Sequence, residues 1–192
     1  MGVKVMSTSS RPVRREKRVA VVLCTGGGRT ARREGVETAR MDCRQALRAY
    51  PQGIMACAQG CLGLGSCAAA CRLGAIAVGE QGAAEVLPEK CVGCGVCVKA
   101  CPQNLIALVS ADTTITARCS NRDGGAEARK ACPVSCIACR ICEKNCPAGA
   151  IAVVDNRAVI DGERCISCGM CAVRCPRGVI VDRDGIFSVL RV

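Results

Sequence analysis

The chain has 192 residues, enough for one or two small domains, and 20 of them are cysteine. Its only aromatic residues are one tyrosine and one phenylalanine, so short runs of Ala, Val, Ile and Leu must supply the apolar core. Such a core buries little area, which indicates that disulfides or metal sites help to hold the chain folded. The sequence has no histidine. This excludes c-type haem attachment, Rieske clusters, Cys/His zinc sites and histidine acid–base catalysis.

The formal net charge is +11, which by itself would favour a nucleic acid or an acidic membrane as partner. That charge counts every cysteine as neutral, whereas a [4Fe–4S]²⁺ core with four thiolates carries about −2. Four such clusters would leave about +3 on the metal-loaded protein. Most of the basic excess is therefore expected to balance clusters, and no nucleic-acid partner is predicted.

The first quarter of the chain differs from the rest in pattern. Residues 1–18 are basic and without periodicity, which predicts a disordered tail. Residues 19–53 form an N-terminal segment, with a predicted strand at 19–23 and an Arg-rich stretch of helical potential up to residue 50. No signal peptide is visible and the run 19–23 is too short to span a bilayer, so a reducing cytoplasm is expected.

The turn after this strand resembles a dinucleotide-binding loop. Gly26 and Gly28 have the right spacing, but neither a second apolar strand nor an acidic residue at its end follows. The turn is therefore interpreted as an ordinary loop beside a metal site, and no nucleotide is predicted.

The rest of the chain is a fourfold repeat of a cysteine run, a small or proline-containing turn and a short apolar strand. The runs begin at Cys61, Cys91, Cys136 and Cys165, so the steps between them are 30, 45 and 29 residues. This grouping predicts one unit at residues 54–110, an insert at 111–131 and a second unit at 132–192. The strands are expected at 75–78, 105–109, 150–154 and 179–181. Two hairpins are expected, 150–154 with 157–160 and 179–181 with 186–190.

The cysteine runs have the spacing of bacterial ferredoxins. In C-x₂-C-x₂-C-x₃-C-P, three thiolates hold one cubane cluster and the fourth binds the other cluster of the pair. The runs that begin at Cys91, Cys136 and Cys165 match this pattern fully. The first run, interpreted as Cys57, Cys61, Cys67 and Cys71, has longer internal gaps and Arg72 in place of the proline. The predicted fold class is α+β, with two tandem ferredoxin-like dicluster units built of short hairpins and short helices.

The crossover of the fourth cysteine assigns sixteen ligands to four [4Fe–4S] clusters. Cluster 1 takes Cys57, Cys61, Cys67 and Cys101; cluster 2 takes Cys91, Cys94, Cys97 and Cys71; cluster 3 takes Cys136, Cys139, Cys142 and Cys175; cluster 4 takes Cys165, Cys168, Cys171 and Cys146. Four cysteines remain: Cys24, Cys43, Cys119 and Cys132. They are interpreted either as ordinary buried thiols or as the ligands of a fifth cluster, and both interpretations stay open.

Two other scaffolds also use many cysteines. A disulfide framework would explain their density but not three repeats of one spacing, each followed by proline. Zinc ribbons use two C-x₂-C pairs for each metal and would leave the additional cysteine of every run without a role. Cluster binding accounts for the whole pattern.

Four stretches together resemble the B subunit of the Rnf electron-transport complex, an ion-translocating ferredoxin:NAD⁺ oxidoreductase. They are CAQGCLGLGSC at residues 57–67, CVGCGVCVKACPQNLI at 91–106, RCSNRDGGAEARKAC at 118–132 and CRICEKNCPAGAI at 139–151. The resemblance extends over about residues 19–180. Family members usually begin with a membrane-anchoring helix and a further cluster motif, and neither is predicted from this sequence. They also tend to carry a second cysteine after the position of Cys24, where this chain has Gly28.

The resemblance implies a relay subunit with no catalytic residue of its own. It would pass low-potential electrons between ferredoxin, or another redox protein, and the membrane subunits of the complex. No transmembrane helix is predicted in this chain, so it is expected to be cytoplasmic and peripheral on the inner face of the membrane. The alternative is a free soluble polyferredoxin that shuttles electrons between cytoplasmic oxidoreductases.

Overall fold

The computed structural model describes residues 16–184. Most of the predicted tail and the expected strand at 186–190 lie outside the described residues. The elements are β1 (Arg18–Val22), the 3₁₀ helix η1 (Gly27–Arg29), α1 (Cys43–Ala49), α2 (Ser66–Ala69), β2 (Ile76–Val78), β3 (Ala84–Val86), α3 (Val96–Ala100), β4 (Ile106–Ser110), β5 (Ile115–Ala117), α4 (Gly125–Ala131), α5 (Ile141–Lys144), β6 (Ile151–Val154), β7 (Arg157–Ile160), α6 (Met170–Arg174) and β8 (Ile180–Asp182). Within residues 16–184, no helix has the length and apolar character that crossing a bilayer requires.

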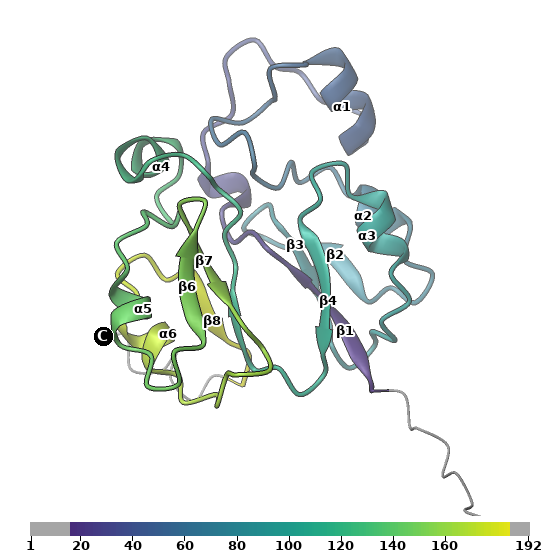
Figure 1. Cartoon of the computed structure of the whole chain (residues 1–192). Coiled ribbons are helices and arrows are strands. Elements are labelled where there is room, and N and C mark those ends of the chain that lie inside the picture. Colours follow the sequence, from purple (N-terminus) through teal and green to yellow (C-terminus); the bar gives the residue numbers. More distant parts are fainter. Residues whose placement is uncertain (1–15, 185–192) are drawn as a thin grey trace, which may run out of the picture.

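In the part of the chain that the structure describes, the strands form four antiparallel pairs, two in each half (Figure 1). In the first half β2 pairs with β3 and β1 pairs with β4; in the second half β6 pairs with β7 and β5 pairs with β8. The predicted hairpin at 150–154 and 157–160 is confirmed, with Ile151 opposite Ile160 and Val154 opposite Arg157. The two halves are α+β units of short strands and short helices, as the sequence predicts.

The two halves follow one plan. In each, a hairpin and two short helices come from the cysteine repeats, and an additional strand from earlier in the chain pairs with the last strand of the half. The backbone contacts repeat as well. The N–H of Leu23 donates to the carbonyl of Leu105 at 2.7 Å, and the N–H of Arg118 donates to the carbonyl of Val179 at 2.7 Å. Strand β1 is therefore the counterpart of β5, and each pairs with the last strand of its own half.

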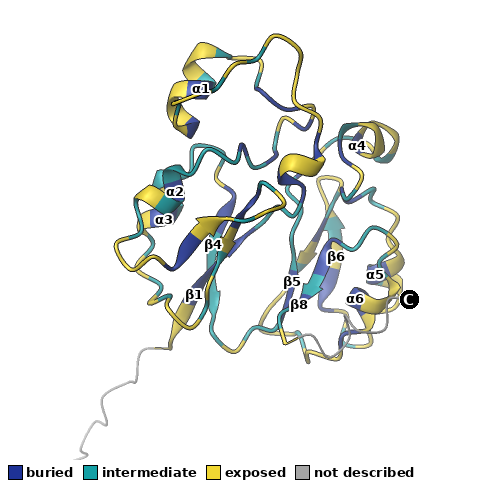
Figure 2. Cartoon of the chain, turned by 180° about the vertical axis from the view of Figure 1, so that it is seen from behind, coloured by how far each residue is buried: buried dark blue, intermediate teal, exposed yellow. Residues whose placement is uncertain are grey.

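The apolar core is small and includes cysteines. In the first half, Ala20, Ile76 and Ile106 pack with Cys67 and Cys97. In the second half, Ile115, Ile151, Val179 and Ile180 pack with three cysteines of the repeats. The buried residues gather along the strands, whereas α1 is mostly exposed (Figure 2). Because aliphatic residues and thiols share these cores, groups held by the thiols would contribute directly to the packing of the fold.

Helix α1 begins at a cysteine whose position is well defined. Asp42 accepts a hydrogen bond from the N–H of Gln45 at 2.8 Å, and the Gln45 side chain accepts one from the N–H of Asp42, which forms a capping box. The N–H of Cys43 then donates to Ser66 Oγ at 2.9 Å, one residue before Cys67 on α2. These bonds fix the start of α1 against the first cysteine run.

Removing the capping acceptor should loosen this helix. We expect Asp42→Ala to cost about 1 kcal/mol of stability, equivalent to a fall of roughly 2–4 °C in apparent Tm for a chain of this size. Asp42→Asn keeps an acceptor at the same place and should retain most of the stability. Anaerobic thermal unfolding followed by circular dichroism measures both. Equal losses in the two variants would show that the cap is not what holds α1 in place.

Candidate metal centres

The cysteine runs share an unusual backbone conformation. On both sides of Cys94, Cys139 and Cys168 the neighbouring residue has a positive φ between 54° and 76°. The residues are Gly93 and Gly95, Ala138 and Arg140, and Ser167 and Gly169. Three of them are not glycine, and each therefore stores strain of about 1–2 kcal/mol. Left-handed residues on both sides of a cysteine give a tight loop, the kind of backbone turn that forms anion-binding concavities at iron–sulfur sites.

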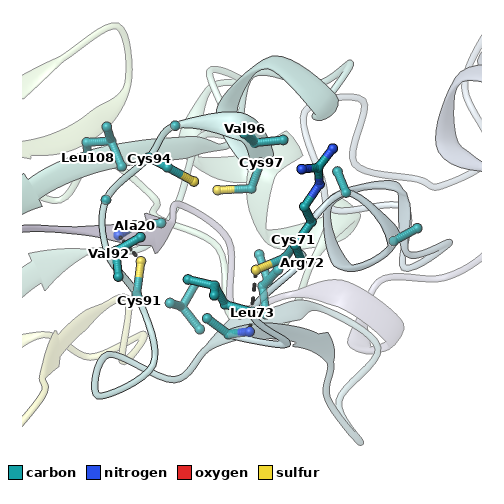
Figure 3. A pocket seen from close by; sticks show the side chains of 17 residues that line it. Ala20, Cys71, Arg72, Leu73, Cys91, Val92, Cys94, Val96, Cys97 and Leu108 are labelled. Atoms are coloured by element: carbon teal, nitrogen blue, oxygen red, sulfur yellow. Dashed lines mark hydrogen bonds between the residues drawn. The ribbon is translucent and has the colours of Figure 1, made fainter.

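The first set of thiols lines a pocket beside β1 and α3. Its cysteines are Cys71, Cys91, Cys94 and Cys97, and their sulfurs point into one shared space (Figure 3). The N–H of Ala20 on β1 donates to Cys91 Sγ at 3.4 Å, and the N–H of Ala75 donates to Cys71 Sγ at 3.4 Å. This is the predicted membership of cluster 2, including the cysteine that crosses over from the first run.

A second pocket of the first half contains four thiols, and one of them comes from α1. Its cysteines are Cys43, Cys61, Cys67 and Cys101. Burial raises the pKa of the Cys67 thiol to about 11. The charges of Cys61, Cys101 and Cys43 raise the same pKa further, as expected for sulfurs that face one another. Cys57, which the sequence grouping assigned to cluster 1, is not among the residues that line this pocket.

The place of Cys43 follows from a gap in the first run. Cys61 and Cys67 are six residues apart, as are Cys136 and Cys142 in the third run. Leu64 stands where the third run has Cys139, and Gly63 and Gly65 on its two sides have φ values of 71° and 77°. The loop therefore has the usual shape but lacks its middle thiol, and Cys43 enters from α1 instead. The equal six-residue separation was the sequence signal for this arrangement.

The second half contains two further sets, each with its crossover cysteine. One pocket is lined by Cys136, Cys139, Cys142 and Cys175, and another by Cys146, Cys165, Cys168 and Cys171. Burial raises the pKa of Cys142 and of Cys171 to about 11. The other three cysteines of each set raise these pKa values further. The structure thus brings together the eight residues that the sequence assigned to clusters 3 and 4.

The remaining cysteines lie between the two halves. Cys24 follows β1, Cys119 follows β5, and Cys57 and Cys132 each precede the first cysteine of a run by four residues. The charges of Cys119, Cys24 and Cys132 add to burial in raising the pKa of Cys57 to about 12, so these thiols are near one another. Of the four cysteines that the sequence left over, three are therefore grouped here, with Cys57 in the place of Cys43.

The donor sets fit iron–sulfur clusters. All twenty cysteines lie within the described residues and none is in a disulfide there. Within residues 16–184, no three Cys, Asp or Glu side chains are arranged to hold a single metal ion. The thiolates of a cubane lie farther apart than those around one ion, because the iron–sulfide core separates them. Three of the crossover thiols also accept an N–H from the residue four positions later, at 3.3–3.4 Å, as cluster-bound sulfur does.

Comparison with known families finds ferredoxin-type domains over three of the cysteine runs. A 4Fe–4S dicluster domain matches residues 135–180, and a 4Fe–4S binding domain matches residues 84–107. This chain carries two 4Fe–4S ferredoxin domains. The matches contain the three regular cysteine runs, whereas the first run and the thiols between the halves lie outside them.

Curated relatives confirm the resemblance to Rnf-type B subunits. Over 116 residues the chain is 43% identical to the B subunit of the Na⁺-translocating ferredoxin:NAD⁺ oxidoreductase complex of Acetobacterium woodii, covering 60% of this chain and 34% of that protein. Over 129 residues it is 37% identical to the B subunit of the proton-translocating ferredoxin:NAD⁺ oxidoreductase complex of Clostridium ljungdahlii, covering 67% of this chain and 44% of that protein. The chain thus spans between a third and a half of the length of these relatives.

A solved structure is also similar, but only weakly. It is a chain of the formate dehydrogenase–heterodisulfide reductase–formylmethanofuran dehydrogenase complex from Methanospirillum hungatei. Identity is 23% and the TM-score is 0.26, with coverage of 64% of this chain and 51% of that chain. At that TM-score the likeness supports no statement about this protein.

The close approach of the cluster 2 loop to β1 gives a test of the site. A Cβ on Gly93 would lie 2.4 Å from the carbonyl oxygen of Arg18, and its φ is +67°. We expect Gly93→Ala to displace the loop and to remove roughly four irons per chain. Gly74→Ala is the matched control, since Gly74 has φ +58° with nothing within 4 Å. The control should cost only the backbone strain of about 1 kcal/mol. Full iron in both variants would contradict the placement of this loop.

Proposed function

We propose that this chain is an iron–sulfur electron-transfer subunit that relays low-potential electrons between ferredoxin and an Rnf-type ion-translocating membrane oxidoreductase. The observation that carries the proposal is the grouping of sixteen thiols in four pockets, four to each. Similarity to two B subunits of ferredoxin:NAD⁺ oxidoreductase complexes supplies the setting. We propose the same activity, partners and location for this chain as for the B subunits of those complexes.

Three of the proposed ligand sets combine three thiols of one loop with one distant thiol, and the set with Cys43 combines two thiols of a loop with two distant ones. The sets are Cys43, Cys61, Cys67 and Cys101; Cys71, Cys91, Cys94 and Cys97; Cys136, Cys139, Cys142 and Cys175; and Cys146, Cys165, Cys168 and Cys171. A [4Fe–4S] cluster supplies reversible one-electron transfer when bound. The chain contributes the thiolates, N–H donors to sulfur and a partly buried apolar environment. These are the features that tune a reduction potential.

Three thiols reach the surface beside apolar side chains. Cys94, Cys139 and Cys168 are exposed. Val92 and Val96 on the two sides of Cys94 are 65% and 47% exposed, and Ile166 and Met170 beside Cys168 are 65% and 41% exposed. Exposed apolar residues around a redox centre suit a transient electron-transfer partner, whose interface is small. We propose that electrons enter and leave through these surfaces, with the chain peripheral to the membrane on its cytoplasmic side.

Metal content tests the core of the proposal. Protein purified without oxygen should contain about 16 Fe for four clusters or about 20 for five, with equal sulfide. Dithionite-reduced samples should give EPR signals of [4Fe–4S]⁺ centres. Colourless, folded protein without iron would overturn the proposal, and zinc in place of iron would do the same.

Single substitutions that introduce a charge test the proposed partner surfaces beside Cys94 and Cys168. We expect Val92→Glu or Ile166→Glu to slow reduction by ferredoxin about tenfold, since a carboxylate placed in an apolar contact costs roughly 1.4 kcal/mol. Val154→Glu is the control, because Val154 is 50% exposed on β6 and flanks no exposed cysteine. Stopped-flow kinetics measures the rates and iron analysis checks that the clusters remain. If neither variant is slower than the control, these surfaces are not where ferredoxin docks.

A further inference from the structure

Four cysteines between the two halves occupy equivalent positions in the repeat. We call them the bridging set: Cys24, Cys57, Cys119 and Cys132. Cys24 comes two residues after β1, and Cys119 comes two residues after β5, the counterpart of β1. Cys57 stands four residues before Cys61, as Cys132 stands four residues before the first cysteine of the third run. Each half therefore contributes one matching pair.

Hydrogen bonds bring the two pairs together. Ser120 Oγ donates to the carbonyl of Leu23 at 3.0 Å, which places Cys24 and Cys119, the neighbours of these two residues, side by side. Gly26 lies against two sulfurs of the set, because a Cβ built on it would be 3.0 Å from Cys132 Sγ and 3.7 Å from Cys24 Sγ. Thiols from both halves thus face one small region.

Cys57 reaches the same region by backbone pairing. The N–H of Ala56 donates to the carbonyl of Ala31 at 2.8 Å, and Arg32 forms a β-bridge with Met55. These contacts hold the segment before Cys57 against the segment that follows η1. The pKa of Cys57 is raised to about 12 by burial first, and the other three thiols of the bridging set raise it further. Proximity to all three agrees with the backbone contacts.

We infer that the bridging set binds a further [4Fe–4S] cluster, located between the two dicluster units and held by two cysteines from each. This deepens the proposed function and rests on it, because the chain must be a cluster protein for the site to be loaded. Neither half supplies more than two of the thiols, so the site is complete only where the halves meet.

The site adjoins one proposed cluster in each half. The N–H of Cys61 donates to Cys24 Sγ at 3.4 Å, and the N–H of Cys136 donates to Cys119 Sγ at 3.3 Å. Cys61 and Cys136 are the first ligands of the two neighbouring sets. A cluster at the bridging set would therefore be hydrogen-bonded to the first ligand of a neighbouring set in each half. Such a cluster would connect the two units in series.

The surroundings suit an anionic group. The N–H of Cys136 donates to Cys119 Sγ, as backbone donors to a cluster-bound sulfur do. Asn121 is 1% exposed and its side-chain Nδ2 has no hydrogen-bond partner among the residues that the structure describes. Asn121 is two residues from Cys119, so this buried donor lies next to the bridging set in the chain. Five clusters at about −2 each would also offset nearly all of the +11 formal charge.

A double variant tests whether the site is loaded. In Cys24→Ala/Cys119→Ala the iron content should fall from about 20 to about 16 per chain, and the EPR signals of the other four clusters should persist. Equal iron in wild type and double variant, at about 16, would overturn the inference while leaving the proposed function intact. Iron-free wild type would instead overturn the proposed function. Circular dichroism confirms that the variant remains folded.

A third substitution in that background tests which cysteine belongs to which site. Adding Cys57→Ala should change nothing, because the cluster that it helps to bind is already lost. Adding Cys43→Ala should remove about four more irons, because Cys43 belongs to the neighbouring set. The reverse pattern, with loss on adding Cys57→Ala and none on adding Cys43→Ala, would refute the bridging set as defined here.

A steric variant tests the site without removing a thiol. Gly26→Ala would press on Cys132 Sγ and should lower the iron content from about 20 toward 16. Gly124→Ala is the matched control, since Gly124 is in the same part of the fold, has φ −58° and has nothing within 4 Å of a built Cβ. Unchanged iron in Gly26→Ala, with the control also unchanged, would count against a cluster at this place.

Discussion

Coordination of thiolates is the interaction on which this fold depends. The aliphatic core of each half is a handful of Ala, Val and Ile residues that pack against cysteines. Within residues 16–184 the strands are three to five residues long and pair only in twos, and an isolated two-stranded pair is marginal in water. Bonds from thiolates of different loops to one cluster would supply the stability that such a core lacks. Because these bonds form only in the folded state, their free energy adds to that of folding.

The loops show the cost of this arrangement. Ala138, Arg140 and Ser167 all adopt left-handed backbone conformations that only glycine adopts freely. Such strain persists where the surroundings over-determine it, and it gathers at ligand-binding sites. Here the strained residues flank Cys139 and Cys168, the exposed second cysteines of the third and fourth runs. Backbone strain is therefore concentrated beside the proposed cluster ligands.

Much of this could be predicted from the sequence. The cysteine spacing indicated the fold class and the pairing of the repeats, and the turn residues Asp155 and Asn156 indicated the hairpin of 150–154 with 157–160. The sequence pattern did not reveal β5, since its three residues lie within the predicted connecting insert. Nor did it indicate the partner of β1, because pairing over nearly ninety residues leaves no local signal.

In the first cysteine run, sequence spacing groups Cys57 with Cys61 and Cys67, whereas the structure places Cys43 beside them. Cys57 is closer in sequence to Cys61 than Cys43 is, so proximity along the chain favoured Cys57. The capped start of α1 is a local feature, but the hydrogen bond that holds Cys43 against the first run, from its N–H to Ser66 Oγ, is a tertiary one. The loop around Leu64 has the same backbone conformation as the loops around Cys94, Cys139 and Cys168, which indicates that a thiol from elsewhere replaces its middle cysteine. This is evident only when the loops are aligned position by position.

The matching positions of the two cysteine pairs have a consequence for ancestry. A protein with a single dicluster unit and one such pair could form the same four-sulfur site across the twofold axis of a homodimer, because each copy would present the same face to the other. Duplication and fusion of that gene would then place the site inside one polypeptide.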